Sequence, residues 1–236
     1  MKVLGVIPAR GGSKRVKDKN ILPIKGKPLI GYTIEDALSS KLMDKVVVST
    51  DSDKIAGVVK EVYDIEVIMR PAEYAKDDSP IEEALLHAHE YFAKQDFLAD
   101  IVVWMQANVP IRKEGMIDQV IEKLSYSDAD SCVTCCVSQE PVELMKVIND
   151  QGMLVPLQNN VKSIRWQEFP KRYLLDGSIV ALRADNLYKT RGIRRAHIYL
   201  GEKVIPMVQE ESIYSLEVDT PHELKLFDYY LERYKL

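Results

Sequence analysis

The first 138 residues alternate between short apolar runs and amphipathic stretches. The apolar runs are bounded by turn residues and predict buried strands at residues 3–9, 45–50, 65–70, 100–106 and 129–138. Between them, apolar residues recur at helical spacing and predict helices at residues 28–40, 51–63, 79–95 and 114–126. Strands that alternate with helices in this way predict an α/β fold. We expect a doubly wound, mostly parallel, Rossmann-like sheet that is covered on both faces.

Residues that favour the start of a helix support these assignments. Pro28 suits the first turn of the first helix, and Asp51 or Ser52 is expected to cap the second. Ser79 is expected to cap the third helix, with Pro80 as its first residue.

The alternation ends near residue 138. Residues 143–157 predict two strands joined by a turn, and residues 158–173 are polar and irregular. The remaining pattern predicts strands at residues 177–183, 202–208 and 212–219 and a closing helix at residues 221–234. We therefore expect a single domain over residues 1–236 with a small β-rich arm or insertion at residues 139–176. Such an arm fits contact with another subunit and a lid over a site equally well.

Composition limits the classes of partner. The chain has 236 residues, a net charge of -4 and a pI near 5.7, which argue against general nucleic-acid binding. No apolar run approaches the roughly 18 residues of a membrane span, and the first residues lack the cleavage site of a signal peptide. We expect no membrane partner and a cytoplasmic location.

The cysteines and two of the histidines are weak candidates for metal binding. Cys132, Cys135 and Cys136 lie in a predicted buried strand, where cysteine acts as a small apolar residue. A single C-x-x-C pair does not define a zinc or redox site. His87 and His89 are two positions apart on a predicted helix and so point to different faces.

Positive charge is concentrated in the stretch VIPARGGSKRVKDKN, residues 6–20. This stretch follows the first strand, and open α/β sheets bind ligands at the carboxyl ends of their strands. Adjacent glycines let the backbone approach a phosphate, and the basic side chains add charge, so we expect a polyphosphate site. The stretch matches neither the dinucleotide fingerprint nor the Walker loop. The alternative is a solvated basic loop.

IPARGGSKRVKDKN resembles the I-P-A-R-G-G-S-K-x-x-x-x-K-N signature of the acylneuraminate cytidylyltransferase (CMP-sialic acid synthetase) family. Further matches follow in order: GKPLIGYTI, VVVSTDSDKIA, RPAEYAKD, MQANVPIR and LEVDTPHEL. The resemblance covers essentially the whole chain and is weakest in the arm. Enzymes for the eight-carbon sugar KDO resemble the basic stretch less well, because they lack its serine-lysine and lysine-asparagine pairs.

The resemblance implies a reaction between CTP and a nine-carbon 2-keto sugar acid. The anomeric hydroxyl attacks the α-phosphorus, pyrophosphate leaves and a CMP-sugar forms. The residues implied to hold the triphosphate are Arg10, Gly11, Gly12, Ser13, Lys14 and Lys19. The implied catalytic residues are Arg10, Lys19 and Asp219. Asn20 and Arg70 are implied to contact the cytidine, helped by Asp77 or Ser79.

Two carboxylates are candidates for a divalent metal. Residues two apart on a strand share a face, so Glu217 and Asp219 present paired carboxylates suited to Mg²⁺ or Mn²⁺. The alternative is an edge strand with polar alternation. Asp219 could also accept the proton of the sugar hydroxyl.

The resemblance assigns the sugar to residues near the end of a strand and in the arm. Gln106 matches a glutamine that meets the substrate, although a strand-end turn residue is the alternative. The other candidates are Lys146, Arg165, Gln167 and Asp176.

Three positions depart from the family pattern. Asp176 stands where the family has asparagine, residues 107–110 read A-N-V-P in place of P-T-S-P, and Glu217 replaces an aspartate. The sugar could therefore be sialic acid, legionaminic or pseudaminic acid, or another acidic sugar, and another nucleotide is possible.

Two other classes of function stay open. One is a nucleotidyltransferase for a sugar or polyol phosphate, and the other is a catalytically silent nucleotide-binding relative. The resemblance also implies a homodimer formed through the arm.

Overall fold

The computed structural model describes residues 1–76, 78–158, 165, 168–193 and 195–234. Its helices are α1 (Leu29–Ser39), α2 (Asp53–Val62), α3 (Ile81–Ala93), α4 (Met116–Ser125), α5 (Ala184–Thr190) and α6 (Pro221–Tyr234). The longer strands are β1 (Val3–Pro8), β4 (Lys45–Thr50), β5 (Glu66–Met69), β6 (Ile101–Trp104), β7 (Ser131–Val137), β10 (Tyr173–Arg183) and β11 (Val204–Gln209). Two short hairpins join β2 (Pro23–Ile24) to β3 (Lys27–Pro28) and β8 (Lys146–Ile148) to β9 (Leu154–Pro156).

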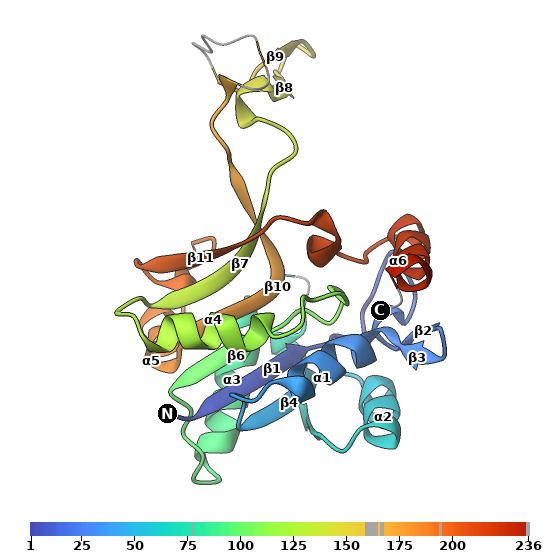
Figure 1. The fold of residues 1–236 in the computed structure, drawn as a ribbon, viewed down its shortest axis with the longest axis vertical. Helices are drawn as coiled ribbons and strands as arrows, with labels where there is room; N and C mark the ends of the chain where they lie inside the picture. Colours follow the sequence, from blue (N-terminus) through green and yellow to red (C-terminus); the bar gives the residue numbers. More distant parts are fainter. Residues whose placement is uncertain (77, 159–164, 166–167, 194, 235–236) are drawn as a thin grey trace.

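The longer strands form one sheet in the order β11-β7-β10-β6-β1-β4-β5 within the described part of the chain (Figure 1). β10 is antiparallel to both of its neighbours, and the other neighbouring pairs are parallel. The predicted α/β fold with a mostly parallel sheet is therefore confirmed. The ligand-binding edge expected from the sequence lies at the carboxyl ends of β1, β4 and β6.

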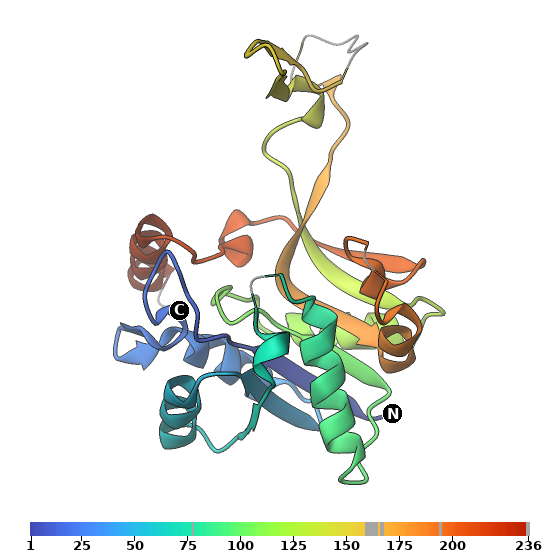
Figure 2. The same ribbon diagram turned by 180° about the vertical axis from the view of Figure 1, so that it is seen from behind.

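Alternate residues of the central strands supply the two faces of the core. Val3 and Ile7 of β1 join the cluster that packs against α1, α2 and α4, whereas Leu4 and Val6 join the cluster with α3 and α5. Figure 2 shows α3 and α5 on the face opposite to α1 and α4. Burial on both faces explains why these strands read as continuous apolar runs.

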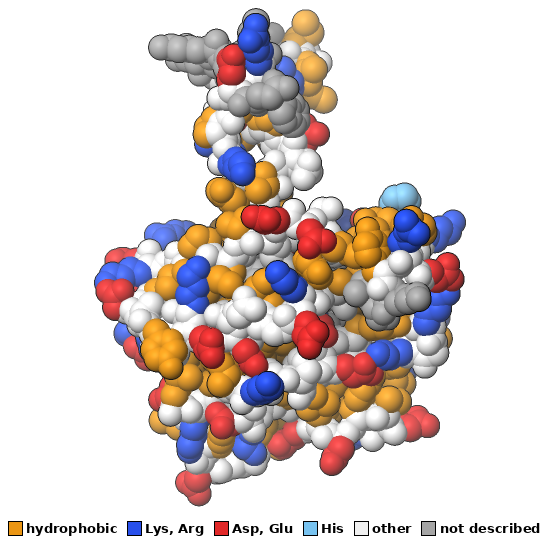
Figure 3. All heavy atoms as spheres, in the orientation of Figure 1, with side chains coloured by type: hydrophobic (Ala, Val, Ile, Leu, Met, Phe, Trp, Pro, Cys, Tyr) orange, Lys and Arg blue, Asp and Glu red, His pale blue; other side chains and the backbone are white. Residues whose placement is uncertain are grey.

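The arm extends away from the body of the molecule (Figure 1). It carries the β8–β9 hairpin at its end, and it is joined to the body by the end of β7 and the start of β10. Apolar side chains are exposed on it, including Ile148 at 73%, Met153 at 61% and Leu154 at 69% exposure. Figure 3 shows apolar side chains along the arm and at its base.

The strand predicted at residues 212–219 is wrong. Residues Ser212–Ser215 form a 3-10 turn, η6, and residues 216–219 belong to neither a strand nor a helix. The alternation that suggested a strand is real, because Val218 is buried between the more exposed Glu217 and Asp219. The Val218 amide donates to the Asn108 carbonyl at 2.7 Å, but no ladder follows.

The cap expected for α3 is also wrong. α3 begins at Ile81 with Pro80 as its N-cap, and no side chain caps it. The Ser79 hydroxyl instead donates to the Glu73 carbonyl at 2.6 Å and accepts from the Lys76 amide at 3.0 Å, which closes the preceding loop. Ser52 does cap α2, where it accepts from the Ile55 amide.

The cysteines and His89 are part of the packed interior. Cys132 and Cys135 are buried in β7, and burial raises the pKa of the Cys132 thiol to about 11. His89 contacts the Tyr188 hydroxyl at 2.8 Å and the Ala99 carbonyl at 3.0 Å. None of the described helices is both long and apolar enough to cross a membrane.

Candidate active site

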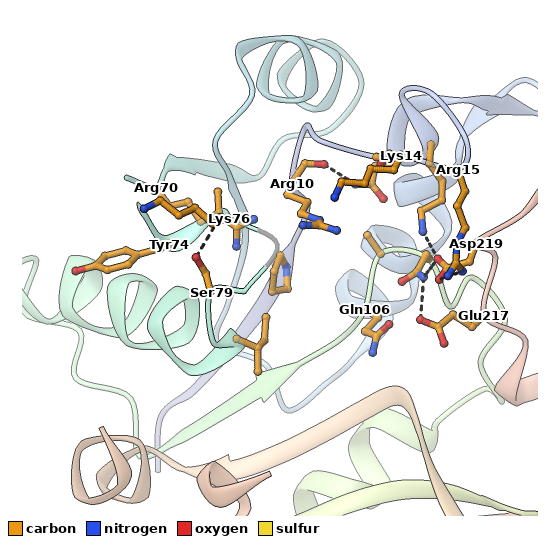
Figure 4. A pocket seen from close by; sticks show the side chains of 18 of the residues that line it. Arg10, Lys14, Arg15, Arg70, Tyr74, Lys76, Ser79, Gln106, Glu217 and Asp219 are labelled. Carbon is orange, nitrogen blue, oxygen red and sulfur yellow. Dashed lines mark hydrogen bonds and ion pairs between the residues drawn. The ribbon is translucent and has the colours of Figure 1, made fainter. Parts of the chain in front are cut away.

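A cavity of about 550 Å³ opens beyond the carboxyl ends of β1 and β6 (Figure 4). The residues predicted from the sequence that line it are Arg10, Ser13, Lys14, Lys19, Asn20, Arg70, Ser79, Gln106, Glu217 and Asp219. Gly11 and Gly12 belong to the same basic loop. Asp77 and Gln167 lie outside the described residues. The structure thus brings together side chains from the two ends of the chain.

Contacts with neighbouring segments shape the basic loop that follows β1. The Gly11 amide donates to Asp51 Oδ1 at 3.0 Å, and Asn20 Nδ2 donates to the Arg10 carbonyl at 3.2 Å. A Cβ at Gly11 would lie 2.9 Å from the Cβ of Ser52, so the close approach to α2 requires glycine. These contacts turn the loop back over the sheet edge and place its cations around the cavity.

A corner of opposite charges closes one side of the cavity. Asn108 Nδ2 donates to Glu217 Oε1 at 3.2 Å and to Asp219 Oδ1 at 2.8 Å, so one amide group links the two carboxylates. Lys19 Nζ forms a hydrogen bond and ion pair with Asp219 Oδ1, and Arg15 lies 3.7 Å from its Oδ2. Partial burial pulls the pKa of Asp219 upward, but the surrounding hydrogen bonds and cations outweigh it and lower the pKa.

The start of α6 fixes the position of Asp219. The Glu223 carboxylate accepts from the Asp219 amide at 2.9 Å and from the Thr220 amide at 2.6 Å. The Thr220 hydroxyl accepts in return from the Glu223 amide at 3.4 Å. This reciprocal capping box holds the Asp219 backbone where the extended segment enters the helix.

Arg70 lies on the opposite side of the cavity, beside Tyr74 and Lys76 (Figure 4). Its side chain is buried, with 7% of the residue exposed, and its Nε has no hydrogen-bond partner among the described residues. Burial is the main cause that lowers the pKa of this guanidinium. A buried donor without a partner favours binding of a polar ligand here.

Buried side chains fix the backbone of Gln106 through hydrogen bonds. Its carbonyl accepts from Arg112 Nη2 at 3.0 Å and from the Thr33 hydroxyl at 3.2 Å. The Arg112 side chain is 1% exposed and also donates to the Ser178 carbonyl at 3.0 Å. Gly177, at φ +65°, leaves room for the Gln106 side chain, because a Cβ there would lie 2.1 Å from Gln106 Nε2.

The remaining predicted sugar residues are not among those that line this cavity. Lys146 lies on β8, and the side chain of Arg165 is 77% exposed in the arm. Asp176 is buried, and its carboxylate accepts hydrogen bonds from neighbouring protein groups. Within one chain, the described residues of the cavity come from the body and none from the arm.

Sequence reasoning missed Asn108 and the participation of Arg15, Tyr74, Lys76 and Trp104 in the cavity lining. The position of Asn108 offered a signal, since it is a polar residue two positions after the predicted strand at residues 100–106. Polar groups at this edge of a parallel sheet are frequent ligand contacts.

The amino-acid sequence matches a known family. A sequence profile described as cytidylyltransferase matches residues 4–234. The chain belongs to the cytidylyltransferase family. Among curated relatives, it is 30% identical over 227 residues to N-acylneuraminate cytidylyltransferase of Streptococcus agalactiae serotype V, covering 93% of this chain and 51% of that relative. The chain spans about half the length of this and two further Streptococcus agalactiae relatives, at 51% each.

A second cytidylyltransferase relative matches over nearly its full length. The chain is 30% identical over 233 residues to CMP-N,N'-diacetyllegionaminic acid synthase of Legionella pneumophila, covering 98% of this chain and 97% of that relative. Among solved structures, CMP-2-keto-3-deoxy-manno-octonic acid synthetase complexed with CTP has the same fold. It superposes with a TM-score of 0.73 at 21% identity, over 100% of both chains. The resemblance drawn from the basic stretch is therefore confirmed.

Proposed function

We propose that this protein is a cytidylyltransferase that transfers CMP from CTP to a nine-carbon 2-keto sugar acid and releases pyrophosphate. One observation carries the proposal: the cavity brings the cations of the basic loop together with a linked pair of carboxylates, and Lys19 pairs directly with Asp219. The names of the two relatives, for N-acylneuraminate and diacetyllegionaminic acid, support an acidic sugar as acceptor.

The basic loop would bind the triphosphate. Arg10, Lys14 and Lys19 would neutralise its charge, and the amides of Gly11, Gly12 and Ser13 would add donors. In the reaction, the anomeric oxygen forms a bond to the α-phosphorus while the bond from that phosphorus to pyrophosphate breaks. Positive groups fixed beside the pyrophosphate stabilise the charge that accumulates there. Asp219 would receive the proton of the hydroxyl.

The buried side of the cavity would bind the nucleoside. Arg70 and Ser79 lie on this side, and Asn20 lines the cavity beside the basic loop. The Nε of Arg70, which has no partner among the described residues, can donate to a polar group of the base or ribose. Gln106, fixed by Arg112 and Gly177, would read the acceptor sugar on the other wall.

Glu217 and Asp219 fit a divalent metal. Both carboxylates bind the same Asn108 amide group, so their oxygens converge, and oxygen is the donor that Mg²⁺ and Mn²⁺ prefer. Groups of three or more acidic, histidine or cysteine ligands do not occur among the described residues. Two carboxylates together with phosphate oxygens and water suit Mg²⁺. When bound, the metal supplies positive charge that polarises the phosphate groups.

The arm would join two copies of the chain into a homodimer. Its exposed apolar side chains are of the kind that subunit contacts cover, and Lys146 and Arg165 lie on it. In such a dimer, these two cations would reach the acceptor carboxylate in the partner's cavity. Light scattering of the purified protein tests this, and a monomeric mass would contradict it. A cytoplasmic location, where CTP is available, completes the proposal.

Pyrophosphate release tests the function directly. With Mg²⁺ present, CTP, UTP, GTP and ATP are each paired with a panel of 2-keto sugar acids, with Asp219→Asn as the inactive control. We expect release with CTP and a nonulosonic acid. A preference for another nucleotide would refute the assignment of the base, and release only with a sugar phosphate would refute the acceptor class. CTP binding without release for any pair would indicate a silent relative.

A further inference from the structure

The Asp176 carboxylate is buried, with 8% of the residue exposed, and it is surrounded by hydrogen-bond donors. Oδ1 accepts from the Thr134 hydroxyl at 2.6 Å and from the Ser178 amide at 3.0 Å. Oδ2 accepts from Gln209 Nε2 at 2.6 Å and from the Ser215 hydroxyl at 3.1 Å. The four donors are neutral groups and belong to β7, β10, β11 and η6.

The first pair of bonds shapes the part of β10 that contacts Gln106. The pairing of β10 with β7 shifts register between Leu175 and Val180. Gly177 lies in this bulge, and its carbonyl accepts from the Gln106 amide at 3.3 Å. Because Asp176 Oδ1 binds the amide just beyond Gly177, it fixes the turn against which the Gln106 side chain packs.

The second pair of bonds holds the segment that leads to the carboxylates. Ser215 is the last residue of η6 and lies two positions before Glu217. Gln209 reinforces this contact, since its Nε2 also donates to the Tyr214 carbonyl at 3.1 Å. Between η6 and α6, the Val218 amide donates to the Asn108 carbonyl at 2.7 Å and holds the middle of the extended segment. The bond from Ser215 to Asp176 therefore ties the beginning of this segment to the sheet.

We propose that Asp176 is a positioning residue that couples the acceptor-reading Gln106 to the carboxylate pair Glu217 and Asp219. It acts through its four donors rather than by contact with the sugar. The inference rests on the proposed function of the cavity. Arg70 and the basic loop follow β5 and β1, which are separate from the elements that supply the four donors to Asp176.

Asp176→Asn tests this coupling with little change of shape. The substitution replaces one carboxylate oxygen, an acceptor, by an NH₂ group, a donor, which then faces the hydrogen-bond donors around residue 176. We expect kcat/KM for the sugar acid to fall about tenfold and the Mg²⁺ concentration for half-maximal rate to rise severalfold. CTP affinity measured by calorimetry without metal should stay within about twofold.

Ser215→Ala separates the effect of Asp176 on the carboxylate pair from its effect on Gln106. It removes one donor to Oδ2 and leaves the bulge around Gly177 intact. We expect a higher Mg²⁺ requirement with an unchanged KM for the sugar acid. Amide hydrogen exchange of residues 212–220, measured without substrate or metal, should be faster in both variants.

Asn186→Ala is the matched control. Asn186 is also buried, with 6% exposed, and its side chain donates to the Tyr199 carbonyl at 2.6 Å. It lies on α5, beyond the end of β10 that pairs with the beginning of β6. The control should lose stability while its Mg²⁺ requirement and the exchange of residues 212–220 stay as in the wild type.

The outcomes distinguish this inference from the proposed function. Unchanged acceptor KM, metal requirement and exchange in Asp176→Asn would overturn the inference. A loss of CTP affinity as large as the loss of kcat/KM for the sugar acid would also overturn it. Asp176→Asn would then affect the whole cavity and not only the sugar and metal side. If the wild type releases no pyrophosphate, the proposed function fails, and the exchange comparison still decides whether Asp176 holds residues 212–220.

Discussion

Gly177→Ala isolates the contact between Gly177 and Gln106. The added Cβ would lie 2.1 Å from Gln106 Nε2 and 2.6 Å from its Cδ, far inside van der Waals contact. The Gln106 side chain must therefore move, while its backbone stays held by Arg112 and Thr33. The left-handed backbone at φ +65° adds a cost of about 1–2 kcal/mol to folding.

The expected kinetic effect is larger than this stability effect. A displacement of about 1 Å in a group that orients a substrate can reduce the rate by about 100-fold. We therefore expect kcat/KM for the sugar acid to fall between about 10- and 100-fold, with CTP binding unchanged. The assay is pyrophosphate release with the sugar acid varied at saturating CTP.

Gly192→Ala is the control for backbone strain. Gly192 has φ +78°, and a Cβ there would meet no atom of the described residues within 4 Å. Gly192→Ala should lose the same amount of stability from backbone strain, about 1–2 kcal/mol measured by urea unfolding, and should keep normal kinetics. Wild-type kinetics in Gly177→Ala, or an equal kinetic loss in Gly192→Ala, would refute the role of this contact.

Three further changes test other parts of the structure. Lys19→Met should reduce turnover by about 100-fold or more, because it removes a cation from both the triphosphate and Asp219; near-normal turnover would exclude Lys19 from the site. Arg112→Met should lower the free energy of unfolding by about 3–5 kcal/mol, measured by urea titration, because Asp36 and buried carbonyls lose their partner; a loss below about 1 kcal/mol would contradict this. Burial raises the pKa of Asp36 to about 6 against the opposing charge of Arg112. The folded state therefore binds more protons, and stability should fall gently from about pH 4 to about pH 6 and then level off; Asp36→Asn should remove this slope.

The sequence was informative where burial and periodicity coincide. β1, β4 and β6 are buried on both faces, so their apolar runs predicted them without ambiguity. The residues around Val218 show the limit of the method. The alternation of polar and apolar residues here reflects the burial of one side chain, Val218. A strand also needs hydrogen bonds to a neighbouring backbone, and the sequence pattern does not reveal whether such a neighbour is present.

The site was predictable to the extent that its residues follow strands or match a motif. Arg10 and Lys19 belong to the loop after β1, and both line the cavity. Asn108 was missed because its role depends on two carboxylates that lie more than a hundred residues later in the chain. Asp176 was assigned to the sugar because it stands at the position of a family asparagine that lies near the sugar. Its bonds to β7, β11 and η6 could be seen only in three dimensions.

The arm is a direct continuation of two interior strands. Tyr173 and Leu174 of β10 pair with Val137 and Cys136 of β7 at its base, so the base of the arm is part of the sheet. A load applied at the base of the arm would pass down this ladder into the sheet. The first interruption that it meets is the register shift after Leu175, beside Gly177. Such a load would therefore act where Gly177 packs against Gln106, a residue that lines the cavity.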